Sequence, residues 1–170
     1  MAVIDMGWPY LKPYLTLGNE IMNQTVSNDD VLKRVRGILA RQPFSTLLKT
    51  EATQASADGT CEFRISIDGN LMQHLGTVHG GVLGYAADTA LTFAAGIAYG
   101  IPVITSEFKI NFLRPVVGEV LVAKGHVVYK GRTQAVTRCD LFVVKEGEEK
   151  LCATAQGTIV VLPEPASSGA

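Results

Sequence analysis

The chain has 170 residues, of which 47% are hydrophobic, and its formal net charge at pH 7 is −1. This length and composition favour one compact domain with a buried core. The nearly balanced charge excludes binding to nucleic acid or to an anionic membrane through an overall positive charge.

The sequence opens with a mixed segment that has no clear hydrophobic period. Residues 1–26 are interpreted as an extension that packs on the domain or on a partner subunit. Ser27 is the expected N-cap of a helix whose apolar residues keep helical spacing to Leu39, and Pro43 is expected to end this segment. We therefore assign residues 1–44 to an N-terminal extension that contains a helix.

Two strands are predicted next, at residues 45–56 and 60–68, joined by Asp58-Gly59. In the second, Cys61, Phe63 and Ile65 alternate with polar residues, which is typical of a strand with one buried face. The three cysteines, Cys61, Cys139 and Cys152, have neither CxxC spacing nor an even count, which favours reduced thiols and a cytoplasmic location. No basic segment followed by an apolar stretch opens the chain, so we expect no signal peptide.

A long run of small apolar residues follows. It opens with His79-Gly80-Gly81, and between Gly80 and Tyr99 its single charge is Asp88. The run predicts a helix buried nearly all round, and its carboxylate and threonines favour a core helix over a membrane span. Ionised carboxylates are almost never buried without a partner or a task, and a glycine pair leaves backbone N–H groups open to a carbonyl oxygen. The helix therefore predicts an acid or base together with an oxyanion site.

Four β-rich segments complete the domain, at residues 103–113, 117–129, 133–145 and 150–162, before a tail at 163–170 that we expect to be disordered. The order predicts an α+β fold. In it, an antiparallel sheet with one solvent-exposed face wraps around one long, central, hydrophobic helix.

These segments carry a family resemblance. The stretch from Gln73 through His79-Gly80-Gly81 to Asp88, with the later strand Thr105–Pro115, resembles the hotdog-fold acyl-CoA thioesterases. The closest subgroup is typified by the phenylacetate-pathway and 4-hydroxybenzoyl-CoA enzymes, and the resemblance covers residues 45–162. It implies a hotdog domain over 45–162, an acyl-CoA or aryl-CoA substrate, no cofactor beyond the coenzyme A of the substrate, and a homodimer that assembles into a homotetramer.

The resemblance also implies roles for single residues. Asp88 matches the catalytic Asp or Glu, and Gly80 matches the backbone N–H that polarises the thioester carbonyl. Gln73 matches an Asn or Gln of the family, but its pairing with Asp88 departs from the usual Asn–Asp or Gln–Glu, so it is either a carbonyl contact or a loop residue. Thr92 and Ser106 match positions that orient the acid or the water, and each is otherwise an ordinary packing residue.

Other residues have roles that stay open. His79 is a general acid, an oxyanion helper or a structural residue that orients its loop, and the structural role is preferred. With His74 and no third ligand in view, it predicts no metal site. Gly81 contacts substrate or permits close packing. Arg114, Lys130 and Arg132 are candidates for binding the phosphates of coenzyme A, although such residues are more often simply solvated.

Helix geometry predicts a site shared between two chains. Gly80 and Asp88 are eight residues apart, which is about 12 Å along a helix axis. A two-fold axis would place Gly80 of one chain beside Asp88 of the other. Asp88 would then attack the thioester or deprotonate a water. A hotdog-fold hydratase, which pairs an acid with a nearby His, and a non-catalytic acyl-CoA-binding protein are the alternatives.

Overall fold

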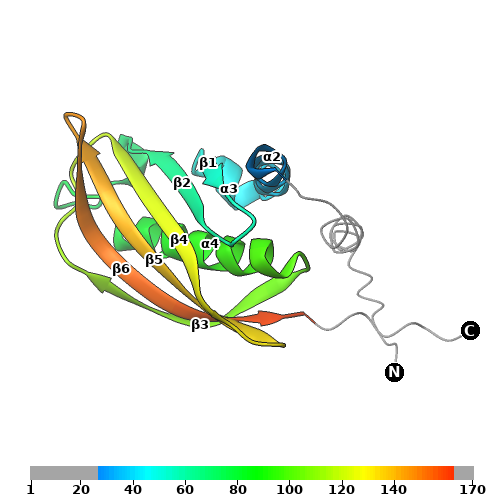
Figure 1. Cartoon of the computed structure of the whole chain (residues 1–170). Helices are drawn as coiled ribbons and strands as arrows, with labels where there is room; N and C mark the ends of the chain where they lie inside the picture. Colours follow the sequence, from blue (N-terminus) through cyan, green and yellow to red (C-terminus); the bar gives the residue numbers. More distant parts are fainter. Residues whose placement is uncertain (1–26, 163–170) are drawn as a thin grey trace, which may run out of the picture.

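The computed structural model describes residues 27–162, which form one sheet and three α-helices (Figure 1). The sequence expectations for residues 1–26 and 163–170 lie outside the described residues. In chain order the elements are α2 (Asn28–Leu39), α3 (Pro43–Leu47), β1 (Glu51–Ala55), β2 (Cys61–Ser66), the 3-10 turn η1 (Gly69–Leu71), α4 (Gly80–Tyr99), β3 (Val103–Phe112), β4 (Val120–Lys130), β5 (Gln134–Lys145) and β6 (Glu148–Val161).

The six strands form one antiparallel sheet in the order β1-β2-β4-β5-β6-β3, and α4 packs along its concave face (Figure 1). The predicted α+β hotdog architecture is therefore confirmed. By length and hydropathy α4 could cross a membrane, but Ala87, Ala90, Leu91 and Ala94 are fully buried against the sheet. Its small residues let the curved sheet approach the helix closely.

Glycines on the sheet set how near α4 can come. A Cβ atom added to Gly125 on β4 would lie 2.5 Å from the Ala90 carbonyl oxygen. On the neighbouring strand β2, the Cys61 thiol donates a hydrogen bond to the same oxygen at 3.4 Å. A side chain at position 125 would therefore push α4, and the residues it carries, away from the sheet.

We expect Gly125→Ala to destabilise the protein by about 1–3 kcal/mol, since overpacking against a backbone atom forces the helix to shift. Gly37 on α2 offers a matched comparison because a Cβ added there meets nothing within 4 Å. Gly37→Ala should stabilise the fold by roughly 0.5–1 kcal/mol, because alanine replaces glycine inside a helix. Urea unfolding of both variants measures this, and equal effects of the two substitutions would contradict the packing argument.

The first helix begins as expected, but the strand predicted at residues 45–56 is wrong in its first half. Ser27 caps α2 by accepting the Asp30 N–H. Pro43, expected to end that helix, instead occupies the first turn of the short helix α3, where its missing N–H costs nothing. Strand β1 starts only at Glu51. The apolar run after Pro43 fits a strand as well as a helix, and the proline decided between them.

Strand β2 shows the expected alternation, with Cys61, Phe63 and Ile65 all buried on the α4 side. On the outer side, the carboxylate of Glu62 is nearly buried too. It accepts hydrogen bonds from Thr53 Oγ1 at 2.7 Å and Arg64 Nε at 2.9 Å, and Lys124 Nζ lies 3.8 Å away. Burial alone would raise the pKa of Glu62, but these hydrogen bonds and the two positive charges outweigh it and lower the pKa.

The lowered pKa makes Glu62 a source of pH-dependent stability. Its contribution is present above the ordinary glutamate pKa of about 4.3. It is lost as the pH falls from that value through the lower pKa of the folded state, because the unfolded chain takes up the proton first. We expect Glu62→Gln to be less stable than the wild type at pH 7 and to lose less stability between pH 5 and pH 3. Thermal unfolding across that range is the test, and parallel curves for the two proteins would count against it.

Candidate active site

Within residues 27–162, one face of α4 is left uncovered by the other elements. Gly81 is exposed, while Gly84, Tyr85, Asp88 and Thr92 are half-buried. Members of this set on successive turns are three or four positions apart, so all five lie along one side of the helix. We call them the uncovered strip. The expectation that α4 is buried nearly all round is thus wrong for the described part of a single chain.

Strand β3 runs along one side of the uncovered strip and supplies the partner of Asp88. Thr105 Oγ1 donates a hydrogen bond to Asp88 Oδ1 at 2.7 Å. Thr92 Oγ1 lies 2.7 Å from Thr105 Oγ1. Because a threonine hydroxyl has one proton, Thr105 donates to Asp88 and accepts from Thr92. The carboxylate is thereby held in one orientation, and it makes no other side-chain hydrogen bond within residues 27–162.

A bulge in β3 turns Thr105 inward. The register with β6 shifts between Thr105 and Glu107, which leaves Ser106 as the extra residue. Ser106 is exposed and has no hydrogen bond to Asp88, and Thr105 makes the hydrogen bond to the acid that the family resemblance implied for Ser106 as one alternative. Thr92 acts on Asp88 through Thr105 rather than directly. The sequence contained Thr105 in the same motif, but its direction depends on the bulge.

The helix start presents one free amide. His79 is the N-cap of α4: its Nδ1 accepts the Gly81 N–H at 2.9 Å, and its carbonyl oxygen accepts the Val82 N–H. The Gly80 N–H has no acceptor within residues 27–162. This agrees with the structural role preferred for His79, and it leaves Gly80 rather than Gly81 to bind an incoming oxygen. A Cβ built on Gly80 lies 3.6 Å from the Phe112 ring of β3, so that ring borders the free amide.

Gln73 lies in the loop before α4 and is tied into it. Its Nε2 donates to Thr77 Oγ1 at 2.6 Å, and its backbone N–H donates to the Thr77 carbonyl. These bonds close a turn that leads to the strand-like bridge between Met72 and Val78. Of the two readings of Gln73, this arrangement favours the loop residue.

The three candidate phosphate-binding residues lie at opposite ends of α4. Arg114 is exposed and lies two residues after Phe112, the last residue of β3, whose ring borders Gly80. Lys130 Nζ donates to the Ala98 carbonyl at 2.7 Å, near the C-terminal end of α4. Ala98 is about 27 Å along the helix axis from Gly80. Arg132 lies beside Lys130 in the turn between β4 and β5, so only Arg114 is near the free amide of its own chain.

The cysteines are buried in the core and are free thiols. Burial raises the pKa of Cys61 to about 12 and that of Cys152 to about 11. Because the thiolate is the reactive form, neither is a nucleophile at neutral pH. This is consistent with the sequence-based interpretation of the cysteines as reduced core residues.

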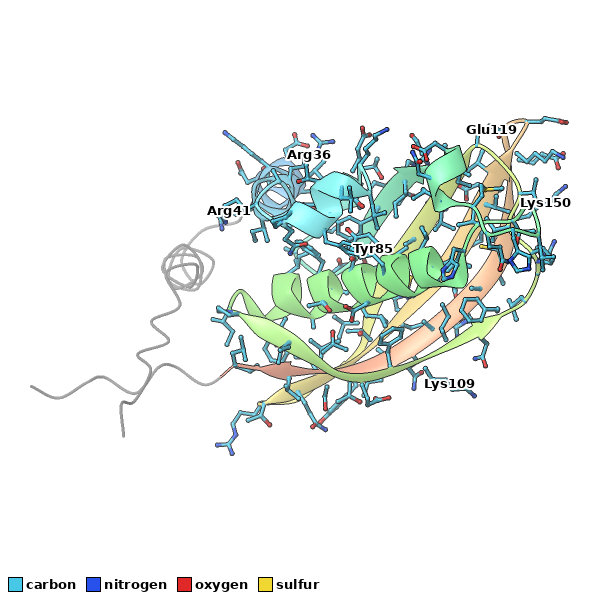
Figure 2. The ribbon with its side chains drawn as sticks, turned by 180° about the vertical axis from the view of Figure 1, so that it is seen from behind. Arg36, Arg41, Tyr85, Lys109, Glu119 and Lys150 are labelled. Carbon is cyan, nitrogen blue, oxygen red and sulfur yellow. The ribbon has the colours of Figure 1, made fainter. Side chains whose placement is uncertain are left out.

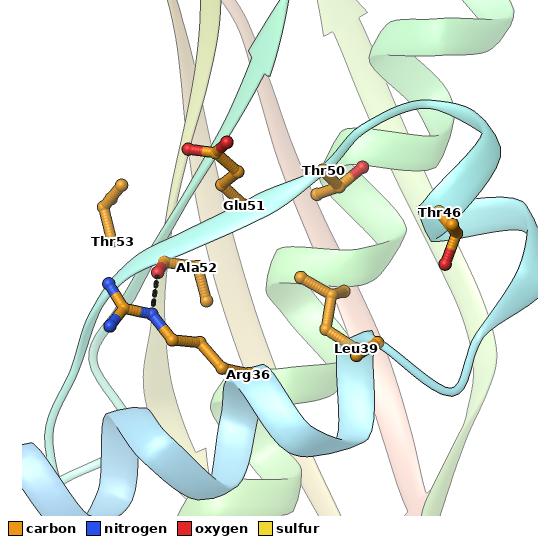
Figure 3. A pocket seen from close by; sticks show the side chains of 8 residues that line it. Arg36, Leu39, Thr46, Thr50, Glu51, Ala52 and Thr53 are labelled. Atoms are coloured by element: carbon orange, nitrogen blue, oxygen red, sulfur yellow. Dashed lines mark hydrogen bonds between the residues drawn. The ribbon is translucent and has the colours of Figure 1, made fainter.

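A separate hollow of about 330 Å³ lies between α2, α3 and β1 (Figure 3). Arg36 Nε donates to the Ala52 carbonyl at 2.9 Å on its wall. None of the candidate residues lines the hollow, but Thr50 does, and its hydroxyl also contacts Tyr85 of α4.

Comparisons with known proteins agree with this geometry. The model of the thioesterase superfamily matches residues 75–150, which include α4, β3, β4 and β5. A thioesterase family protein from Silicibacter pomeroyi, known from a crystal structure, is 31% identical to this chain. The match covers 78% of this chain and 98% of that protein, with a TM-score of 0.71. The chain belongs to the thioesterase superfamily.

Two further proteins are similar to this chain over part of its length or in fold. A protein of Caenorhabditis elegans named as an esterase is 35% identical over 54% of this chain, and the match spans only 56% of that protein. The PaaI protein from the phenylacetic acid degradation operon of Escherichia coli shares the fold, with a TM-score of 0.72 over 80% of this chain and 96% of that one, at 20% identity. Membership in the thioesterase superfamily supports hydrolysis of a thioester bond as the class of reaction.

If Asp88 takes part in the reaction, Thr105 is expected to be a positioning residue, because its hydroxyl holds the Asp88 carboxylate in one orientation. We expect Thr105→Val to lower kcat by about tenfold or more with little change in KM, because it removes a hydrogen bond to a charged group worth about 1.5–3 kcal/mol. The neighbouring substitution Ser106→Ala should leave both constants unchanged. Steady-state kinetics of the two variants test this, and an equal effect at both positions would show that the strand, not the hydrogen bond, matters.

Proposed function

We propose that the chain is an acyl-CoA or aryl-CoA thioesterase, which hydrolyses a thioester to a free acid and coenzyme A without a further cofactor. One observation carries the proposal: α4 has a free backbone amide at its first residue, Gly80, and an oriented carboxylate at Asp88 on its uncovered strip. Polarisation of a carbonyl and supply of a nucleophile or base are the two tasks that acyl transfer to water requires.

In the proposed reaction, the thioester carbonyl oxygen accepts the Gly80 N–H at the helix N-terminus, where the helix dipole also favours the developing negative charge. Asp88 then acts in one of two ways. It attacks the carbonyl carbon, so that the C–S bond breaks and a mixed anhydride forms, which water hydrolyses. Otherwise it takes a proton from a water that attacks the carbon directly. In both cases the thiolate of coenzyme A leaves and is protonated.

The site is proposed to form between two chains. Gly80 and Asp88 are too far apart along α4 for one carbonyl to contact both in the same chain, at about 12 Å. Strand β3 is an edge strand of the sheet, so one of its sides has no strand partner within the described chain. Such an edge readily pairs with another strand, and pairing with the same strand of a second copy gives a two-fold dimer. We propose this homodimer, assembled further into a homotetramer.

Arg114 is the proposed phosphate-binding residue nearest the Gly80 amide of its own chain. Lys130 and Arg132 would contact coenzyme A only if a partner chain brings that end of α4 to the site. Lys130 is already engaged by the Ala98 carbonyl and lies 4.9 Å from the Tyr99 ring centre, a typical cation–π contact. A structural role at the helix end is sufficient to explain its position.

The reaction is tested by free-thiol release from a panel of acetyl-, octanoyl- and benzoyl-CoA. Turnover of at least one thioester, lost in Asp88→Asn, supports the proposal. If the wild-type protein binds these thioesters but releases no thiol, it is a non-catalytic binding protein. Conversion of an enoyl-CoA without thiol release would identify a hydratase instead.

The composite site is tested by mixing two inactive variants. Co-refolded Asp88→Asn and Gly80→Pro chains form mixed dimers in which one of the two sites combines an intact Gly80 amide with an intact Asp88. Because about half of the dimers are mixed, close to a quarter of wild-type activity should return. A mixture that stays inactive would show that both groups act within one chain.

A further inference from the structure

The short helix α3 carries apolar side chains that the rest of the described chain leaves uncovered. Phe44 is 57% exposed and Leu47 is 71% exposed. Helix α3 lies over α4 at Tyr85, on the opposite side of the uncovered strip from β3 (Figure 2). The Phe44 and Tyr85 rings meet edge to face, with centres 5.1 Å apart. The strip is therefore bordered by β3 on one side and by α3 on the other, where Phe44 contacts Tyr85 of the strip.

Tyr85 is held in a fixed orientation by its polar end. Its hydroxyl lies 3.0 Å from Thr50 Oγ1, within hydrogen-bond distance, and its ring contacts Phe44. A wall of apolar rings with one or two fixed polar groups is the usual composition of a small-molecule binding surface.

The position of Tyr85 along α4 connects this wall to the proposed reaction. Tyr85 is five residues after Gly80 and three before Asp88, which are axial separations of about 7.5 Å and 4.5 Å. In the proposed composite site the carbonyl lies beside Asp88 of one chain and Gly80 of its partner, so a group bonded to the carbonyl carbon would be within reach of the Tyr85 ring of the chain that supplies Asp88. The acyl group of the thioester is such a group.

We infer that Phe44, Leu47 and Tyr85 form the surface that binds the acyl group and that they select a bulky apolar acyl group over acetyl. This inference rests on the proposed function. A benzoyl or octanoyl group is large enough to cover the exposed parts of Phe44 and Leu47 and to remove them from water, which stabilises the bound state. An acetyl group is too small to reach them.

The test compares kcat/KM for benzoyl-CoA and octanoyl-CoA with kcat/KM for acetyl-CoA. Phe44→Ala and Leu47→Ala should each lower the bulky-to-acetyl ratio by about tenfold or more, because apolar contacts of this size discriminate by such factors. Activity on acetyl-CoA should stay within about twofold of the wild type. Val128→Ala is the matched control, since Val128 on β4 is 55% exposed and lies outside this surface. The two bulky substrates show whether the surface prefers a ring or a chain.

A second measurement does not depend on hydrolysis. S-phenacyl-CoA, a thioether that cannot be hydrolysed, should bind the wild type more tightly than coenzyme A does, and Phe44→Ala should abolish that difference in calorimetry. Unchanged ratios in both variants, or no preference for S-phenacyl-CoA in the wild type, would overturn the inference. So would loss of the oligomer in Phe44→Ala with unchanged ratios, since the surface would then contact another chain. Failure of the proposed function would be recognised by a different result, namely thiol release by Asp88→Asn at the wild-type rate.

Discussion

Asn in place of Asp88 is expected to lower kcat by a hundredfold or more, which corresponds to a barrier higher by at least about 2.7 kcal/mol. The amide of Asn can still accept the hydrogen bond from Thr105 Oγ1, so the local structure should be kept. Its oxygen, however, is neither a base nor an effective nucleophile at neutral pH. The measurement is single-turnover and steady-state thiol release from whichever thioester the wild type prefers.

Asp140 offers a matched control for that substitution. It lies on β5, on the outer face of the sheet, and accepts a hydrogen bond from Thr154 Oγ1 at 2.7 Å, the same distance as between Asp88 and Thr105. Asp140→Asn removes a carboxylate of the same kind without touching the uncovered strip, so kcat should not change. Asp88→Asn with a wild-type kcat and an unchanged fold would remove Asp88 from the mechanism.

The second large effect is expected at Gly80. Proline at this position removes the backbone N–H yet suits the first turn of a helix, and His79 already has the extended backbone that a residue before proline requires, with φ −64° and ψ 135°. We expect Gly80→Pro to lower kcat by about 10²–10³, the usual effect of losing one oxyanion donor. Circular dichroism and thermal unfolding should show that α4 is intact.

Gly80→Ala is the control because it keeps the N–H. A Cβ at position 80 meets the Phe112 ring at 3.6 Å, an ordinary contact, so the side chain is tolerated. Its kcat should stay within a few-fold of the wild type, at a cost below about 1 kcal/mol. If alanine and proline reduced kcat equally, the effect would come from the added atoms and not from the lost amide.

Several features were predictable because they depend on local pattern. The single carboxylate in a run of small apolar residues identified α4 and Asp88, and the alternation of Cys61, Phe63 and Ile65 identified β2. The helix α3 was missed because its residues fit a strand equally well, and a proline at a first helical turn decided the matter. Thr105 was missed because strand alternation places neighbours on opposite faces, and one bulge residue reverses which neighbour points inward.

By itself the sequence determined most of the elements and the residue pattern along α4: the strands from β2 onward, the position of the long helix, and a carboxylate that follows a glycine pair on it. Periodicity and composition act over neighbouring residues, so they can be read without the fold. Only the tertiary structure decided which groups meet across elements. The hydroxyl of Thr105 reaches Asp88 from β3, and Phe44 reaches Tyr85 from α3, because the curvature of the sheet and the packing of α4 bring distant segments together.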